Sequence, residues 1–175
     1  MSSLVQRRWI GVSVLLTVAL LGCGPGTPTR GAQLAQPAPE IQGTTLDGRA
    51  LRLSELRGRV VLLNFWATWC PPCVEEMPDL QQVADELGPQ GVTVLGLSAD
   101  VGDPEVVARF LRRHRITYPV LIADESAVSA YGVTMLPTSF LVDQQGIVRQ
   151  RYLGPRGRRF LAEDIHAVLN TTTRR

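Results

Sequence analysis

Two cysteines near the middle of the chain, in the run Cys70-Pro71-Pro72-Cys73, have a spacing that suits reversible disulfide chemistry. They follow an apolar segment, residues 60–66, and precede residues 71–87, whose apolar side chains recur at helical spacing. A helix start carries unpaired N–H groups and the positive end of the helix dipole, which together stabilise a thiolate. The two intervening residues let the sulfurs meet across the first turn, so a disulfide can form and open again.

This arrangement favours thiol–disulfide exchange. In the cycle that we expect, Cys70 attacks a substrate disulfide and forms a mixed disulfide with it. Cys73, one turn further along and more buried, then resolves the mixed disulfide and releases the product. Cys70 is therefore the expected nucleophile and Cys73 the expected resolving thiol.

Other uses of the cysteine pair are weaker. A structural disulfide that closes so short a loop would restrict the unfolded chain only slightly. A zinc site needs a second pair of ligands, and His114 and His166 stand alone in the sequence. A copper site made of both thiolates also fits the spacing. We expect no resident metal and no cofactor.

Length and composition place these cysteines in one compact domain. The chain has 175 residues, 45% hydrophobic and 19% charged, which excludes a disordered chain and allows a single core. Its 18 basic residues, all of them Arg, face 16 acidic ones. No basic block stands out, so we expect no nucleic-acid partner. Arg7 and Arg8 account for the whole excess, since 18 − 2 leaves 16 against 16.

The N-terminal residues predict an export signal. Arg7 and Arg8 precede an uncharged apolar stretch, residues 9–21, which is too short for a spanning helix of roughly 20 residues. It ends in Leu-Leu-Gly-Cys23, which resembles the lipobox of bacterial lipoproteins, where the cysteine is acylated and becomes the first mature residue. An ordinary cleaved signal is the alternative. Residues 24–39 are rich in Gly and Pro and predict a flexible linker.

The remaining pattern predicts an α/β domain over residues 40–170, followed by a short tail, residues 171–175. Strand patterns alternate with helical ones and end in a hairpin, which predicts a mixed central sheet flanked by helices. The expected strands are 60–66, 92–97, 118–122, 138–142 and 147–152. The expected helices are 71–87, with a kink at Pro78, then 103–115, 127–131 and 158–169. A small hairpin over 41–53 should precede them, with its turn at Asp47-Gly48.

Residues 64–73, Asn-Phe-Trp-Ala-Thr-Trp-Cys-Pro-Pro-Cys, resemble the active-site segment of the thioredoxin superfamily. More narrowly, they resemble its membrane-tethered extracytoplasmic branch, the TlpA/ResA-like thiol–disulfide oxidoreductases. The positions of Glu76, Pro78 and Pro137 match that branch, as do the N-terminal hairpin and the inserted helix at 103–115. The resemblance covers about residues 40–170 and implies a thioredoxin-like fold.

The resemblance also implies roles for particular residues. Pro137 corresponds to the family's cis-proline, which sets the Leu136 backbone beside the sulfurs to pair with a substrate chain. Trp69 should form an exposed lip over the Cys70–Cys73 disulfide. Glu76 corresponds to a buried acid that relays a proton to Cys73. Asn64 replaces the buried Asp of cytoplasmic thioredoxins and cannot exchange a proton, which leaves that role to Glu76.

From the resemblance we expect a lipid-anchored, extracytoplasmic reductase that faces the periplasm or the outer side of the cell membrane. Its substrates would be disulfides of exported apoproteins, such as those of cytochrome c or copper-site maturation, and its electrons would come from a membrane thiol donor. We expect a monomer. A disulfide-forming oxidant and a non-enzymatic copper carrier are the alternatives. A peroxidase fits less well, because peroxiredoxins carry Thr and Pro where this chain has Ala67 and Leu63.

Overall fold

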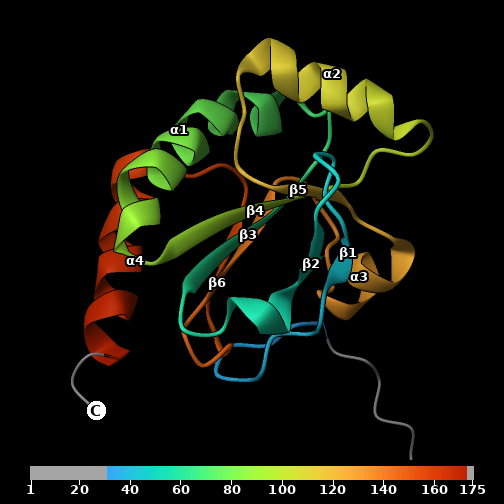
Figure 1. The fold of residues 1–175 in the computed structure, drawn as a ribbon. Helices are drawn as coiled ribbons and strands as arrows, with labels where there is room; N and C mark the ends of the chain where they lie inside the picture. The colour runs from blue at the N-terminus through green and yellow to red at the C-terminus, as the bar shows by residue number, and fades with distance from the viewer. Residues whose placement is uncertain (1–30, 173–175) are drawn as a thin grey trace, which may run out of the picture.

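The computed structural model describes residues 31–172 and shows a central five-stranded sheet (Figure 1). The strand order is β5-β4-β3-β6-β7. The strands are β3 Val60–Trp66, β4 Val92–Ser98, β5 Val120–Ile122, β6 Thr138–Val142 and β7 Val148–Leu153. β3, β4 and β5 run parallel to one another, whereas β6 and β7 are antiparallel to their neighbours. Every residue of β3 is buried, because this strand is central and both its faces are covered.

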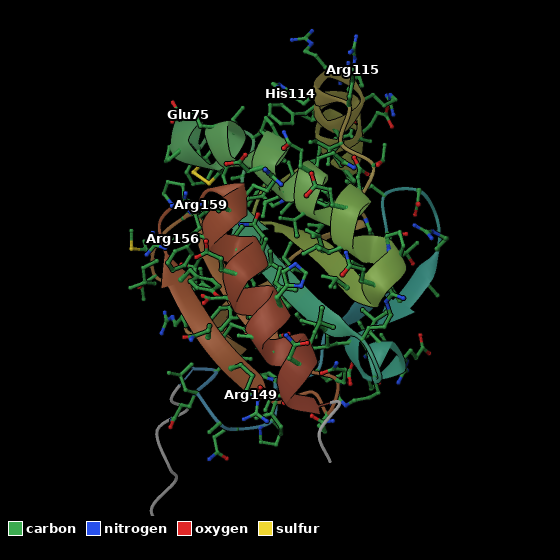
Figure 2. All side chains as sticks on the ribbon, turned by 90° about the vertical axis from the view of Figure 1, so that its left-hand side faces the viewer. Glu75, His114, Arg115, Arg149, Arg156 and Arg159 are labelled. Atoms are coloured by element: carbon green, nitrogen blue, oxygen red, sulfur yellow. A yellow bond between two sulfur atoms is a disulfide. The ribbon has the colours of Figure 1, made fainter. Side chains whose placement is uncertain are left out.

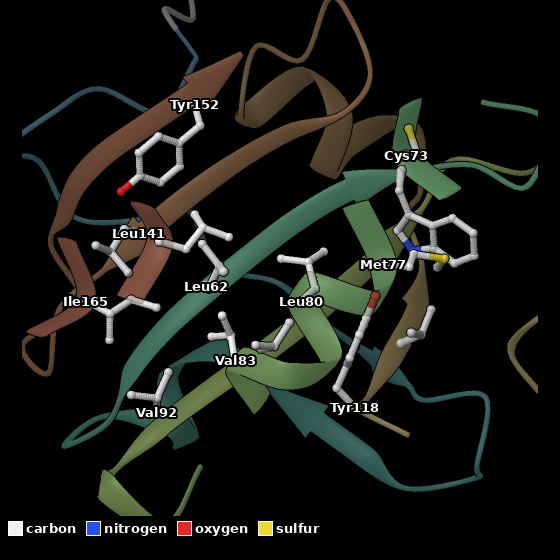
Figure 3. Packing of buried hydrophobic residues seen from close by; sticks show 14 of the residues in the cluster. Leu62, Cys73, Met77, Leu80, Val83, Val92, Tyr118, Leu141, Tyr152 and Ile165 are labelled. Carbon is white, nitrogen blue, oxygen red and sulfur yellow. The ribbon is translucent and has the colours of Figure 1, made fainter. Parts of the chain in front are cut away.

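Helices cover both faces of this sheet (Figure 1). α1 (Pro71–Leu87) and α4 (Arg158–Thr172) pack on one face, where the apolar side chains of Leu80 and Val83 meet the sheet (Figure 3). The other face is covered by α3 (Glu125–Ala130) and a separate hairpin of β1 (Gln42–Thr44) and β2 (Ala50–Arg52). α2 (Pro104–His114) lies at the end of the molecule where α1 starts. Short 3-10 helices occupy Leu53–Leu56 and Gly88–Gln90.

The sequence-based fold class is confirmed: a mixed sheet, flanking helices, an N-terminal hairpin and an inserted helix. α1 continues through Pro78 as one helix, and its ribbon bends along its length (Figures 1 and 2). His114 is exposed, and its ring stacks on that of Phe110, one turn earlier in α2. α4 extends to Thr172, so residues 171 and 172, expected in the tail, belong to this helix.

The flexible linker expected at 24–39 does not extend over residues 31–39. Ala32 N–H donates to the Ala130 carbonyl at the end of α3, and Ala35 N–H donates to the Val148 carbonyl of β7. Ala38 is buried and donates to the Gly146 carbonyl. These backbone bonds hold the segment against the domain, although its composition indicates a linker. The expected signal, the lipidation site Cys23 and residues 24–30 lie outside the described residues.

Candidate active site

The two cysteines lie at the start of α1, just after the loop that connects β3 to this helix. Cys70 is the N-cap residue of α1 and has extended backbone angles. Pro71 and Pro72 are the first two residues of the helix, where proline costs no hydrogen bond because the first N–H groups have no acceptor within the helix. The Cys70 carbonyl accepts hydrogen bonds from the N–H groups of Cys73, at 3.0 Å, and Val74, at 3.2 Å. A disulfide joins Cys70 to Cys73, with their Cα atoms 5.3 Å apart. Cys73 is 1% exposed and Cys70 is 5% exposed.

The loop before Cys70 is fixed by an aspartate from the next strand. Asp100 follows β4, and its carboxylate accepts hydrogen bonds from the backbone and the hydroxyl of Thr68. The Ser98 hydroxyl donates to the same carboxylate, at 2.7 Å. The carboxyl ends of parallel β3 and β4 meet at one edge of the sheet, which brings Asp100 to this loop. Trp69, between Thr68 and Cys70, is 68% exposed.

An apolar hollow of about 520 Å³ opens beside Cys70. Trp69 and Cys70 form one side of it, and Met135 and Leu136, from the loop before β6, form another. The Leu136–Pro137 peptide bond is cis, and Pro137 is buried at the entrance to β6. The residues that the sequence singled out around the cysteines, Trp69 and Leu136, therefore line one hollow together with Cys70.

Glu76 lies one turn beyond Cys73 and is only 3% exposed. Its Oε1 accepts a hydrogen bond from the Arg156 N–H, at 2.9 Å, and its Oε2 accepts one from the Asn64 amide, at 3.2 Å. Burial raises the pKa of Glu76 to about 7. The two hydrogen bonds and the Arg156 charge act in the opposite direction, and Asp79 adds a further upward influence. This carboxyl can therefore gain or lose a proton near neutral pH.

A row of polar side chains crosses the core beneath the cysteines. The Asn64 amide donates both to Glu76 and, at 2.9 Å, to the Ser139 hydroxyl of β6. Register pairs Asn64 with Ser139 across β3 and β6, so the sheet itself places the two side chains together. Tyr118 is buried nearby, its hydroxyl has no partner within residues 31–172, and burial and the Glu76 charge raise its pKa.

Sequence reasoning did not find three parts of this site. Arg156 donates to Glu76 through its backbone N–H, across 80 residues of sequence. Any residue except proline has this N–H, so the residue type gives no signal for the contact. Ser139 follows Thr138 at the start of β6, and a polar residue in a buried strand is the one available signal. Asp100 follows a predicted strand, and its position at a shared sheet edge could have been inferred from the βαβ order. Within residues 31–172, no three metal-ligating side chains cluster, and no helix is long and apolar enough to cross a membrane.

A helix-capping Cys-x-x-Cys disulfide beside a cis-proline, on a sheet of this topology, defines a thiol–disulfide oxidoreductase of thioredoxin-like fold. The chain belongs to the AhpC/TSA family, whose sequence profile matches residues 34–151. It is 35% identical over 157 residues to the thiol-disulfide oxidoreductase ResA of Geobacillus thermodenitrificans, covering 85% of this chain and 89% of that protein. It is 37% identical over 123 residues to ResA of Bacillus anthracis, covering 70% of each.

Solved structures show the same likeness. A thiol:disulfide interchange protein of the thioredoxin family from Chlorobium tepidum superposes with a TM-score of 0.72 and 31% identity, covering 79% of this chain and 99% of that one. A secreted thiol-disulfide isomerase from Corynebacterium glutamicum gives a TM-score of 0.69 and 29% identity, covering 75% and 84%. The chain is thus a thiol–disulfide oxidoreductase.

Proposed function

We propose that this oxidoreductase reduces disulfides in exported proteins while tethered to the outer side of a membrane. The observation that carries the proposal is the Cys70–Cys73 pair at the start of α1, with the ionisable Glu76 buried one turn below it. The ResA relatives support the exchange chemistry. The sequence of the export signal and lipobox supports the tether at Cys23 and a location outside the cytoplasm.

The reaction begins with both cysteines reduced. The Cys70 thiolate, stabilised by the helix start, attacks one sulfur of the substrate disulfide, and the other substrate sulfur leaves as a thiolate. The Cys73 thiolate then attacks the Cys70 sulfur, which forms the Cys70–Cys73 disulfide and frees the second substrate sulfur. Two electrons pass to the substrate, and two protons complete its thiols. A membrane dithiol donor restores the pair by the reverse sequence.

Glu76 serves the second step as a proton relay. Cys73 must lose its proton before it attacks, and Cys73 is nearly inaccessible to water. A carboxyl whose pKa is about 7 accepts and returns a proton at neutral pH, whereas an exposed carboxylate does not. Arg156 and Asn64 hold the carboxyl in place through its two oxygens.

The substrate chain docks in the apolar hollow. Its half-cystine lies against Cys70, Trp69 covers it from one side, and the Leu136 backbone before cis-Pro137 offers edge pairing to the extended chain. No specific apoprotein follows from this hollow. Cytochrome c and copper-site thiols are the targets that the family resemblance suggests.

Replacing Cys70 tests the mechanism. We expect Cys70→Ser to abolish reduction of a disulfide peptide and to leave the fold intact, whereas Cys73→Ser should accumulate a covalent mixed disulfide with the peptide. Gel mobility under non-reducing conditions distinguishes the two variants. Peptide reduction retained by Cys70→Ser would overturn the assignment.

A redox titration decides the direction of the reaction. A potential well below about −200 mV makes the protein a reductant of its substrates, and a potential near about −120 mV makes it an oxidant. We expect the lower value. Tight stoichiometric Cu(I) binding without disulfide turnover would instead favour a copper carrier.

A further inference from the structure

A second hollow, of about 350 Å³, lies beside the redox loop and is lined by arginines. It is formed by Thr68 of the loop and by one face of α2: Val106, Arg109, Phe110 and Arg113. Thr68 precedes Cys70 by two residues, so their Cα atoms are at most about 7 Å apart. The apolar hollow beside Cys70 contains Trp69 and the arginine hollow contains Thr68, so the two hollows adjoin along one loop.

The two arginines in this hollow lack acidic partners. Among residues 31–172, no salt bridge involves Arg109 or Arg113. They stand one helical turn apart on the same face of α2, where like charges repel each other. Arg112, which points elsewhere, pairs with Glu105 at 2.6 Å. The helix thus pairs Arg112, outside the hollow, with an acid. Inside the hollow, Arg109 donates to the Glu105 backbone carbonyl at 3.4 Å, and neither Arg109 nor Arg113 has an acidic partner among the described residues.

Nearby acids do not fill the hollow. Asp100 is the carboxylate closest to Thr68, and its oxygens already accept hydrogen bonds from Thr68 and Ser98. Glu75 is exposed near the start of α1, on the side of the disulfide, whereas the guanidinium of Arg115 follows the last residue of α2 (Figure 2). An acidic partner residue is therefore attracted to the α2 side of the disulfide and repelled from the side of Glu75.

The apolar residues that line the hollow would strengthen an ion pair between its arginines and an acidic ligand. Val106 is half exposed and Phe110 is partly buried, and both add apolar surface to the hollow that Arg109 and Arg113 line. A guanidinium binds a carboxylate through two parallel hydrogen bonds, and an apolar floor excludes water from them. The site thus suits an aspartate or glutamate side chain better than a neutral one.

We propose that Arg109 and Arg113 select disulfide substrates that carry acidic residues next to the reacting cysteine. The inference rests on the proposed reductase function, because it places the acidic segment in the arginine hollow while the half-cystine occupies the apolar one. The partner is an extended acidic segment of a protein substrate. The charges act before and during docking, so they raise the rate of attack by Cys70.

The test uses three disulfide peptides that differ only in the residues flanking one cysteine: Asp, Ser or Arg. We expect the reduced protein to reduce the Asp peptide roughly tenfold faster than the Ser peptide at low salt, and the Arg peptide most slowly. In Arg109→Gln/Arg113→Gln, the Asp-to-Ser rate ratio should fall to about one. The matched control Arg112→Gln/Arg115→Gln removes the same charge from the same helix outside the hollow and should keep the ratio. Half-molar salt should lower the ratio of the unaltered protein.

The outcomes separate this inference from the proposed function. If no peptide is reduced, the reductase function fails. If the peptides are reduced at equal rates, the function stands and the selection by charge is wrong. A ratio that survives in Arg109→Gln/Arg113→Gln, or that falls equally in the control, overturns the hollow as the site. Binding of anionic lipid vesicles that these two substitutions abolish, with no peptide preference, would assign the arginines to a membrane surface instead.

Discussion

Two opposite influences act on the pKa of Glu76. Burial disfavours its charged form, while Asn64 and Arg156 donate hydrogen bonds that favour it. Burial prevails, and the pKa rises from 4.5 to about 7. The unfolded chain therefore ionises Glu76 at lower pH than the native protein does, and the native state binds more protons between these two values. Stability must fall as the pH rises through this interval.

Glu76→Gln makes this effect measurable. Both proteins should respond alike below pH 4.5, but between pH 4.5 and 7 the unaltered protein should lose about 3 kcal/mol relative to the variant. Urea unfolding of the oxidised proteins gives the difference, because oxidised cysteines do not titrate. The groups facing Glu76, which are Asp79, Tyr118 and Arg156, are common to both proteins and cancel. A difference that stays constant with pH would show that Glu76 keeps an ordinary pKa.

The same substitution should slow the resolving step. Without the carboxyl, Cys73 loses its proton to water alone, so we expect turnover of a neutral disulfide peptide to fall on the order of 100-fold at pH 7. The mixed disulfide on Cys70 should accumulate, as rapid acid quenching and mass spectrometry can show. Glu75→Gln, which alters the exposed neighbour, should turn over normally. Equal losses in both variants would assign the effect to surface charge.

Among the elements, α2 depends most visibly on its ends. Asp103 caps it by accepting a hydrogen bond from the Glu105 N–H, at 2.9 Å, and Pro104 follows as its first residue. Val107 and Leu111 are its fully buried residues, so packing contributes little beyond one narrow face. The cap therefore adds to the stability that this face supplies.

Asp103→Ala should destabilise the protein by about 1 kcal/mol, whereas Asp103→Asn, which keeps an acceptor at the cap, should lose much less. Urea unfolding at neutral pH measures both variants. An equal loss in the two would mean that the charge of Asp103, rather than its hydrogen bond, supports α2.

Elements with an unambiguous local signal could be predicted from the sequence. The apolar run 60–66 gave β3 with its observed ends, because a strand buried on both faces needs no alternation. Asp103-Pro104 likewise marked the start of α2. The composition of residues 31–39 predicted a flexible linker, and this prediction was wrong. Backbone hydrogen bonds to β7 and to the end of α3, which only the folded chain provides, hold this segment in place despite its Gly and Pro. Glu76 could be identified from the family resemblance, but its hydrogen bond from the Arg156 N–H could not, because only the folded chain brings the two residues together.

At the scale of the whole molecule, the redox pair and the start of the described chain lie at opposite ends. The described chain starts at one end of the domain and α1 starts toward the other (Figure 1), where the disulfide is drawn (Figure 2). Hydrogen bonds from residues 31–39 to the domain fix that entry point. A domain attached through Cys23 would therefore direct its disulfide away from the bilayer. If the donor lies in the same membrane, as proposed above, the domain has to turn over to meet it, and eight residues, 23–30, have a contour length of at most about 28 Å.

Deleting residues 24–30 should therefore separate the two halves of the catalytic cycle. If Cys23 carries the anchor, joining it directly to Gly31 prevents the domain from turning toward a membrane donor, so the Cys70–Cys73 pair should accumulate as the disulfide in cells. Alkylation of free thiols followed by gel analysis measures the oxidised fraction. The purified deletion variant should still be reduced by a soluble dithiol at the normal rate, because residues 31–39 keep their bonds to the domain. Normal reduction in cells would mean that the donor reaches the far end of the molecule, and the tether would then serve location alone.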